Sequence, residues 1–151
     1  MIRECQLDGI VKDAVKKFRS EFISRKLHLT YEPLNTRVVT DEKWLSFVIE
    51  QVLSNALKYT PSGGITIYME APKTLCIQDT GIGIAPEDLP RIFDKGYTGY
   101  HGRSHKGASG IGLYLCRRVC CNLGHSITAQ SVPDRGTCIR IDLNQKAFEK
   151  E

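Results

Sequence analysis

The stretch Glu50-Gln-Val-Leu-Ser-Asn55-Ala-Leu-Lys58-Tyr59-Thr-Pro61 decides the fold, because it predicts a mostly buried helix with one polar side. Successive helical residues turn by about 100°, which places Gln51, Asn55, Lys58 and Tyr59 on the same side. The remaining surface is largely apolar, as expected for a helix inside a core. An Asn oxygen can bind Mg²⁺ and a Lys can reach a phosphate, although a solvent-facing polar stripe is the open alternative.

The segment Cys76-Ile-Gln-Asp79-Thr-Gly81-Ile-Gly83 predicts a strand that runs into a glycine turn. Alternation along the strand places Asp79 on the same face as the apolar Ile77. A carboxylate there needs a donor as its partner, and a purine amino group is one such donor. The two glycines permit close approach of the backbone. A plain Asp-Thr-Gly turn remains the alternative.

The segment Lys106-Gly107-Ala-Ser-Gly110-Ile-Gly112-Leu113 predicts a glycine-rich loop that enters a helix. Free N–H groups at a helix start can bind phosphate oxygens. The spacing matches neither a Rossmann fingerprint nor a P-loop. Residues 95–109 form a long polar loop that begins with Lys95, and loops of this length are usually functional or mobile.

The order of the predicted elements favours an α+β fold, a two-layer α/β sandwich with a mixed, mostly antiparallel sheet covered by helices on one face. Asp41 is suited to cap the long helix, and Asp8 to cap the first. We expect one domain over residues 1–151, with its core at about 7–143. Helices are predicted at 7–24, 41–59, 84–93 and 110–123, and strands at 27–31, 37–40, 65–69, 74–79, 125–132 and 137–143.

Composition excludes several other classes of protein. The 151 residues are 41% hydrophobic, which supports a packed core and argues against disorder. No run approaches the roughly 18 apolar residues of a membrane span, and the first residues, which are mixed and charged, do not show a signal-peptide pattern. A net charge of +4 without a basic cluster gives no reason to expect a nucleic-acid partner. The six cysteines lie within apolar runs, which predicts buried, reduced thiols rather than a disulfide scaffold.

Taken together, these segments resemble the ATP-binding catalytic domain of bacterial sensor histidine kinases, in the GHKL superfamily. The first stretch is similar to the N box, the Asp79 turn to the first G box, and residues 107–112 to the second G box. Arg91-Ile-Phe93-Asp94 resembles the F box, and Arg135-Gly136-Thr137 resembles the final Gly-Thr element. Finer features, such as Asp94-Lys-Gly-Tyr-Thr-Gly99, resemble the intramembrane-sensing BceS and GraS type of Gram-positive bacteria, which partner peptide-antibiotic ABC transporters.

The resemblance implies a Bergerat-type fold with ATP and Mg²⁺ as cofactors and residues 95–109 as a mobile lid. It implies that Asn55 coordinates Mg²⁺, Asp79 binds the adenine amino group, Tyr59 packs near adenine and Lys58 reaches the phosphates. Asn55 and Lys58 are the expected catalytic residues. The expected nucleotide-binding residues are Asn55, Lys58, Tyr59, Asp79, Gly81, Gly83, Lys95, Gly107, Gly110, Gly112, Leu113 and Thr137.

Two departures refine the expected activity. Many ATP-hydrolysing members place a glutamate four residues before the metal-binding Asn, where this chain has Gln51, and an amide is no general base. The adjacent Glu50 points about 100° away. The sequence therefore favours phosphoryl transfer to a histidine over hydrolysis. A non-kinase GHKL nucleotide-binding module or ATPase that acts through protein contacts is the alternative.

The second departure is the phospho-accepting histidine, since none of the four histidines has the acceptor's context. We therefore expect that histidine on a dimerisation domain of the same parent protein, with a response regulator as the further partner in two-component signalling. The chain is expected to be a cytoplasmic domain, monomeric when isolated, of a parent in the bacterial cell membrane. The four histidines are His28, His101, His105 and His125.

Overall fold

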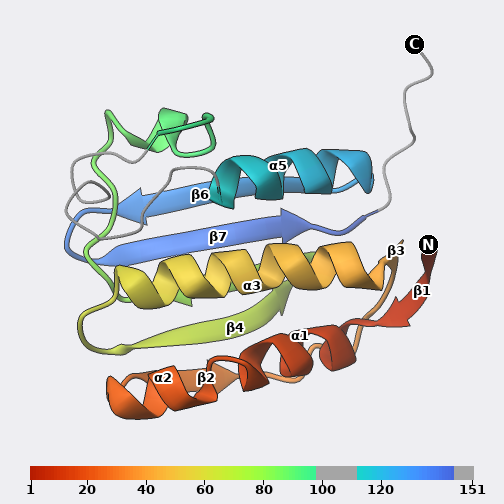
Figure 1. Cartoon of the computed structure of the whole chain (residues 1–151), viewed down its shortest axis with the longest axis horizontal. Coiled ribbons are helices and arrows are strands. Elements are labelled where there is room, and N and C mark those ends of the chain that lie inside the picture. Colours follow the sequence, from red (N-terminus) through yellow and green to blue (C-terminus); the bar gives the residue numbers. More distant parts are fainter. Residues whose placement is uncertain (98–111, 145–151) are drawn as a thin grey trace.

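A five-stranded sheet forms one layer of the computed structural model, which describes residues 1–97 and 112–144 (Figure 1). The strand order is β2-β4-β5-β7-β6, with β2 parallel to β4 and the other neighbours antiparallel. This confirms the predicted mixed, mostly antiparallel sheet. The strands are β2 (His28–Tyr31), β4 (Gly64–Glu70), β5 (Thr74–Asp79), β6 (Ser126–Val132) and β7 (Gly136–Asp142).

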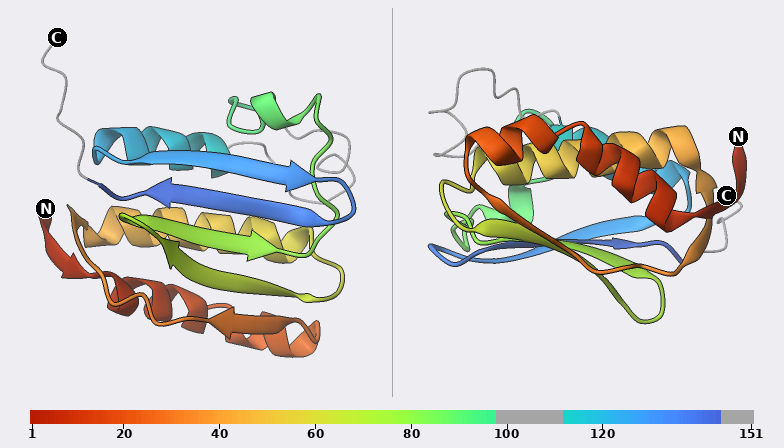
Figure 2. Two further views of the ribbon diagram at one scale, coloured as in Figure 1. Left: turned by 180° about the vertical axis from the view of Figure 1, so that it is seen from behind. Right: turned by 90° about the horizontal axis from the view of Figure 1, so that it is seen from below.

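Four helices of the described residues form the second layer, and they all lie on one side of the sheet (Figure 2). They are α1 (Leu7–Lys16), α2 (Arg19–Ser24), α3 (Glu42–Lys58) and α5 (Gly112–Asn122). The predicted two-layer sandwich is therefore confirmed. None of the helices described is long and apolar enough to cross a membrane.

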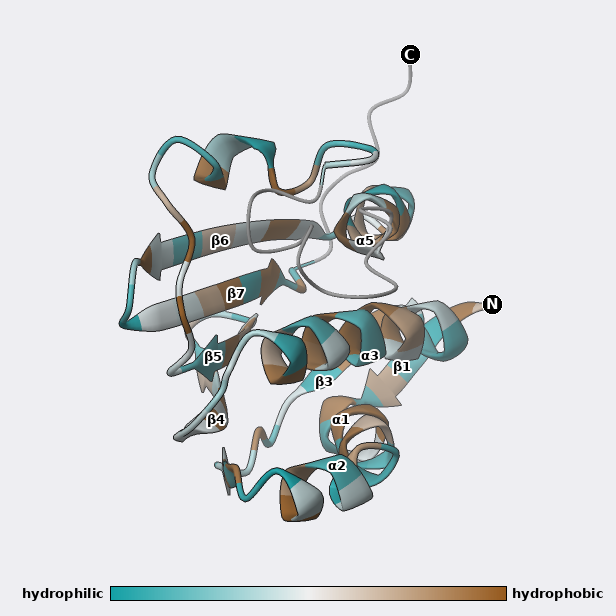
Figure 3. Cartoon of the chain, turned by 60° about the vertical axis from the view of Figure 1, so that its left-hand side comes forward, coloured by the Kyte–Doolittle hydropathy of each residue, from teal (hydrophilic) through white to brown (hydrophobic). Residues whose placement is uncertain are grey.

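Helix α3 lies at the centre of the helical layer, between α1 and α5 (Figure 1). Its start is capped as predicted, because Asp41 Oδ1 accepts a hydrogen bond from Trp44 N at 3.2 Å. Hydrophobic and hydrophilic segments alternate along the helices, which matches burial of one side (Figure 3). Removal of each fully buried Leu or Ile side chain from water contributes about 1.5–3 kcal/mol to the free energy that favours folding. The buried residues of α3 are Leu45, Val48, Ile49, Val52, Leu53, Ala56 and Leu57.

The sheet face beneath the helices consists of cross-strand rows that are apolar over most of their length. One row joins Leu75, Ile141 and Ile127, and the next joins Ile77, Ile139 and Ala129. Alternation places Asp79, Thr137 and Ser131 on this same face, one row further on. The inner face thus changes from apolar to polar at one end of the sheet.

The N-terminal third differs from the prediction. Strand β1 (Ile2–Gln6) was not expected, and it pairs with β3 (Arg37–Asp41) in a separate two-stranded sheet. The strand lacks the alternation of apolar and polar residues by which a half-buried strand is predicted, and only Cys5 is buried. The predicted first helix is divided where the N–H groups of Lys17 and Phe18 bond three residues back, to Ala14 O and Val15 O.

Two further local predictions were wrong. The helix expected over residues 84–93 is only a 3₁₀ turn, Leu89–Arg91, because Pro90 has no N–H with which to continue it. Asp8 does not cap α1, whose N-cap is Gln6. The Asp8 carboxylate instead accepts hydrogen bonds from Leu34 N and Asn35 N, in the connection between β2 and β3.

Candidate nucleotide-binding site

Asp79 ends β5 at the polar end of the inner sheet face. Its Oδ1 accepts hydrogen bonds from Gly81 N at 2.9 Å and Thr137 N at 3.1 Å. The residue is only 8% exposed, and burial raises the pKa of its carboxyl although the two backbone bonds lower it. Among the described residues Oδ2 accepts no hydrogen bond. The structure therefore fixes this carboxylate by one oxygen and leaves the other as an acceptor.

The glycine turn after Asp79 lies against the C-terminal end of α3. Ile82 N donates to Tyr59 O at 3.0 Å, which joins the turn to the helix end. A Cβ on Gly81 would lie 2.2 Å from Tyr59 O, so only glycine permits this approach. Gly83 has φ +75° and passes close to Val132 O. The two predicted glycines thus serve close packing of the site's backbone.

Gln51, on the polar side of α3, faces the start of α5. A Cβ on Gly112 would lie 2.8 Å from Gln51 Oε1, which places this amide beside the helix start. Asn55 and Lys58 are half-buried further along α3. Burial raises the pKa of Tyr59, which follows them at the helix end. This arrangement agrees with the predicted polar side of the helix.

Glu50 lies on a different side of α3 from Gln51. Its Oε2 accepts hydrogen bonds from Lys17 Nζ at 2.7 Å and Ser46 Oγ at 3.2 Å. The carboxylate is therefore engaged next to α1 and away from Gly112. The predicted divergence of these two neighbouring side chains is confirmed.

The phosphate-binding segment is described only in part. Gly112 begins α5, and the half-buried Leu113 follows it. Gly107 and Gly110 lie outside the described residues, as do residues 98–109 of the predicted lid. The predicted roles of these residues stay predictions.

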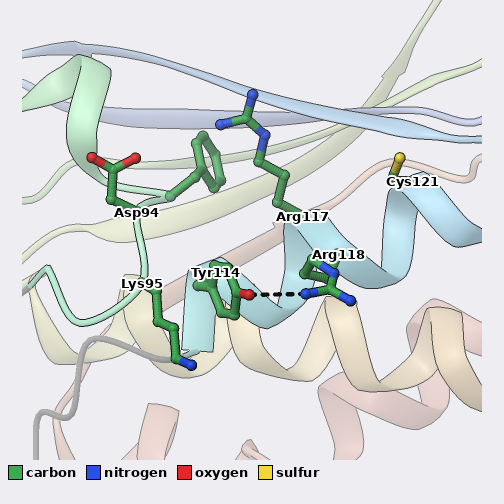
Figure 4. Close-up of a pocket in the computed structure, with 7 residues that line it drawn as sticks. Asp94, Lys95, Tyr114, Arg117, Arg118 and Cys121 are labelled. Carbon is green, nitrogen blue, oxygen red and sulfur yellow. Dashed lines mark hydrogen bonds between the residues drawn. The ribbon is translucent and has the colours of Figure 1, made fainter.

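A pocket of about 460 Å³ lies between α5 and the segment that contains Phe93, and none of Asn55, Asp79 and Thr137 lines it (Figure 4). Lys95 Nζ lies 5.9 Å from the Tyr114 ring centroid there, so this residue, predicted to bind the nucleotide, lies beside α5. Sequence reasoning identified Lys95 but missed Arg117 and Arg118, which line the same pocket and whose sequence signal is an adjacent pair of arginines. The lining residues are Phe93, Asp94, Lys95, Tyr114, Arg117, Arg118 and Cys121.

The donor set fits a magnesium ion held mainly by a nucleotide. The described residues contain no group of three His, Cys, Asp or Glu side chains that could hold a metal. Mg²⁺ commonly takes one or two protein oxygens and completes its shell with phosphates and water. The half-buried Asn55 carries a neutral oxygen that could serve in this way.

Comparison with known proteins supports the site. The family model described as histidine kinase-, DNA gyrase B- and HSP90-like ATPase matches residues 40–147, which is most of the chain and contains the whole candidate site. The chain belongs to this family. The resemblance of its motifs to the GHKL superfamily is thereby confirmed.

Curated relatives within this ATPase family are sensor kinases. The chain is 37% identical over 139 residues to sensor protein BceS of Halalkalibacterium halodurans, covering 90% of the chain and 42% of BceS. It is 30% identical over 154 residues to sensor histidine kinase YxdK of Bacillus subtilis (96% and 46%). It is 41% identical over 107 residues to sensor protein kinase GraS of Staphylococcus aureus strain JH1 (69% and 31%). The chain thus spans less than half the length of these relatives, and their names confirm the resemblance to the BceS and GraS type.

Solved structures share the ATPase family's fold. The catalytic domain of histidine kinase ThkA superposes with a TM-score of 0.82 at 19% identity, covering 97% of this chain and 99% of that one. Full-length ShkA in complex with AMPPNP gives a TM-score of 0.79 at 19% identity, covering 94% and 30%. At these identities the likeness shows the fold alone, and it confirms the predicted sandwich.

Proposed function

We propose that this domain binds Mg²⁺-ATP and transfers the γ-phosphoryl group to a histidine on a dimerisation domain outside this chain. The observation that best supports a nucleotide is the state of the buried Asp79 carboxylate. Gly81 N and Thr137 N bind its Oδ1 and so hold the group in place, which leaves Oδ2 as an acceptor. An adenine amino group supplies the donor that such an acceptor needs.

The roles of the other residues follow from their places around Asp79. Tyr59 packs near the base, since its backbone contacts the Asp79 turn. Asn55 and Lys58, which lie in the last turn of α3 before Tyr59, bind the metal and a phosphate, respectively. Gly112 and Leu113 present the start of α5 to the phosphates. Bound Mg²⁺ neutralises phosphate charge during transfer. Gly107, Gly110 and Lys95 complete the phosphate contacts in this proposal.

Gln51 supports transfer over hydrolysis. Its side chain faces Gly112, and a general base at position 51 could activate water there. An amide cannot act as that base, because it does not take up a proton. Glu50 cannot replace it because its carboxylate is bound to Lys17 and Ser46. An imidazole is itself a strong nucleophile, so positioning and charge stabilisation suffice for its attack on the γ-phosphorus.

We further propose partners for the whole protein. The relatives' names favour a sensor kinase over a non-kinase nucleotide-binding module, so its partners are a histidine-bearing dimerisation domain and a response regulator. The resemblance to the BceS and GraS type supports a parent in the bacterial cell membrane that works with an ABC transporter. This domain would then lie on the cytoplasmic side and be monomeric when isolated.

Phosphotransfer in trans tests the proposed activity. The chain is mixed with labelled ATP, Mg²⁺ and a histidine-bearing hairpin of a sensor kinase of the BceS type, and acid-labile phosphohistidine is measured. We expect the product with the wild type and with Glu50→Gln, and its loss with Asn55→Ala. A chain that binds ATP but leaves every hairpin tried unlabelled would contradict the kinase assignment.

Gln51→Glu tests the reason for weak hydrolysis. We expect the carboxylate beside Gly112 to raise ATP hydrolysis by roughly ten- to a hundredfold, because it can accept a proton from water. Phosphate release by purified variants measures the rate. Glu50→Gln is the matched control and should leave hydrolysis unchanged. An unchanged rate in Gln51→Glu would show that this position is not where a base is missing.

A further inference from the structure

Ser131 belongs to the polar row at the end of the inner sheet face, although no motif pointed to it. It lies on β6 and pairs directly with Thr137 on β7. Thr137 in turn donates its backbone N–H to Asp79 at the end of β5. Three neighbouring strands therefore each contribute one polar residue to the predicted base-binding end of the sheet. Of the three, Ser131 is on the strand furthest from Asp79, because β7 lies between β5 and β6.

The Ser131 hydroxyl makes three contacts. Its Oγ accepts from Ile84 N at 2.8 Å, donates to Gly136 O at 2.9 Å and lies 2.8 Å from Thr137 Oγ1. A backbone carbonyl can only accept, so the single Ser131 hydrogen goes to Gly136. The contact with Thr137 is then a hydrogen bond only if the Thr137 hydroxyl is the donor. One assignment alone satisfies all three contacts.

This assignment fixes the polarity of the Thr137 hydroxyl. Its one hydrogen points to Ser131, so only lone pairs remain on Oγ1 for a further partner. Asp79 beside it is also an acceptor, and the neighbouring N–H groups of Gly81 and Thr137 already bind Oδ1. The Thr137 hydroxyl and the Asp79 carboxylate are thus both acceptors. The Thr60 hydroxyl, which is buried beside Gly81, has no hydrogen-bond partner among the described residues.

We propose that Ser131 is a positioning residue that sets the base specificity of this site by holding the Thr137 hydroxyl as an acceptor beside Asp79. The proposal rests on the proposed binding of a nucleotide base at Asp79. A 6-amino group presents two N–H donors to the two acceptors. A 6-oxo group presents lone pairs to them and is rejected, because neither acceptor can supply a hydrogen. These two acceptors therefore favour adenine over hypoxanthine.

Calorimetry with ADP and IDP, which differ in this group and in the hydrogen that hypoxanthine carries on N1, tests the proposal in the chain as it stands. We expect the wild type to prefer ADP. Ser131→Ala frees the Thr137 hydrogen to turn toward a 6-oxo group, and we expect the ratio of the two dissociation constants to narrow by about tenfold. Ser131→Thr keeps a hydroxyl and should retain the wild-type ratio.

Thr137→Val gives an independent test that leaves the bonds from Ser131 to Ile84 and Gly136 in place. It removes the acceptor, so the ADP preference should narrow here too, even if Ser131→Ala does not fold. In the Thr137→Val background, Ser131→Ala should cause no further change in the ratio.

Two outcomes would overturn the role of Ser131. One is an equal weakening of ADP and IDP binding by Ser131→Ala, which would indicate a purely structural residue. The other is an effect on the ratio that persists without the Thr137 hydroxyl. A wild-type chain that binds neither nucleotide would instead contradict the proposed function itself, so the two failures are distinguishable.

Discussion

Asp8 on α1 and Asp79 at the end of β5 each bind two backbone N–H groups, yet their surroundings differ. Both oxygens of Asp8 are used: Oδ1 accepts from Leu34 N at 3.0 Å and from the Tyr31 hydroxyl, and Oδ2 accepts from Asn35 N at 2.9 Å. Only Oδ1 of Asp79 is used among the described residues.

The pKa values of the two carboxyls shift in opposite directions. Burial raises the pKa of Asp8, but the hydrogen bonds from Tyr31, Leu34 and Asn35 outweigh it and hold the pKa below its usual value. Burial dominates at Asp79 and raises its pKa. A carboxylate fully bound by its own chain stabilises the fold. One that is buried with an unused oxygen costs stability and is suited to a ligand.

The largest expected effect is the loss of nucleotide affinity in Asp79→Asn. The amide replaces an acceptor with a donor facing the base amino group, so ADP and ATP should bind about 100-fold more weakly, as is typical for loss of a charged hydrogen bond. Isothermal calorimetry measures the change. Asp8→Asn is the matched control and should bind as the wild type does; equal affinities for wild type and Asp79→Asn would contradict the adenine assignment.

For the free energy of unfolding we expect the reverse order, with the larger loss in Asp8→Asn and not in Asp79→Asn. Asp8→Asn weakens a fully used carboxylate, so the free energy of unfolding should fall by roughly 1–2 kcal/mol at neutral pH. Asp79→Asn removes a buried charge and should leave the domain no less stable than the wild type. Denaturant unfolding of both variants checks this. A larger loss of stability in Asp79→Asn would mean that Asp79 also belongs to the folding framework.

The pH dependence of stability should separate the two residues further. The pKa of Asp8 is lowered in the fold, so its contribution is full above its unfolded value and is lost as pH falls through the folded value. The pKa of Asp79 is raised, so its penalty is full above the folded value and disappears as pH falls toward the unfolded value. Denaturant unfolding at a series of pH values measures this. As pH falls from neutral to about 3, the difference in the free energy of unfolding between the wild type and Asp8→Asn should shrink.

The smallest expected effect is that of Tyr31→Phe. This change removes one of three donors to Asp8 and keeps the bonds from Leu34 N and Asn35 N, so the cost should be about 1 kcal/mol or less. Nucleotide affinity should stay at the wild-type value. A cost as large as that of Asp8→Asn would show that the phenol, rather than the backbone, holds this carboxylate.

Much of this comparison could not be predicted from the sequence. Asp8 precedes an apolar helical pattern, which predicts a cap, but its true partners lie more than twenty residues away beyond β2. Asp79 was identified because its motif is local: strand, carboxylate and glycines follow one another. Ser131 has no local signal, since its role depends on pairing with Thr137 and contact with Ile84.

The sequence by itself determined the elements whose signals are periodic or local, among them the long amphipathic α3 with its Asp41 cap, the alternation that turns Asp79 inward, and the glycines beside it. Only the tertiary structure decided which backbone groups meet the two carboxylates, that Gln51 faces Gly112 while Glu50 binds Lys17, and that Ser131 fixes the polarity of Thr137. The physical reason is that periodicity specifies which side of an element is buried, whereas hydrogen-bond partners depend on the register between strands and on contacts between residues far apart in the chain.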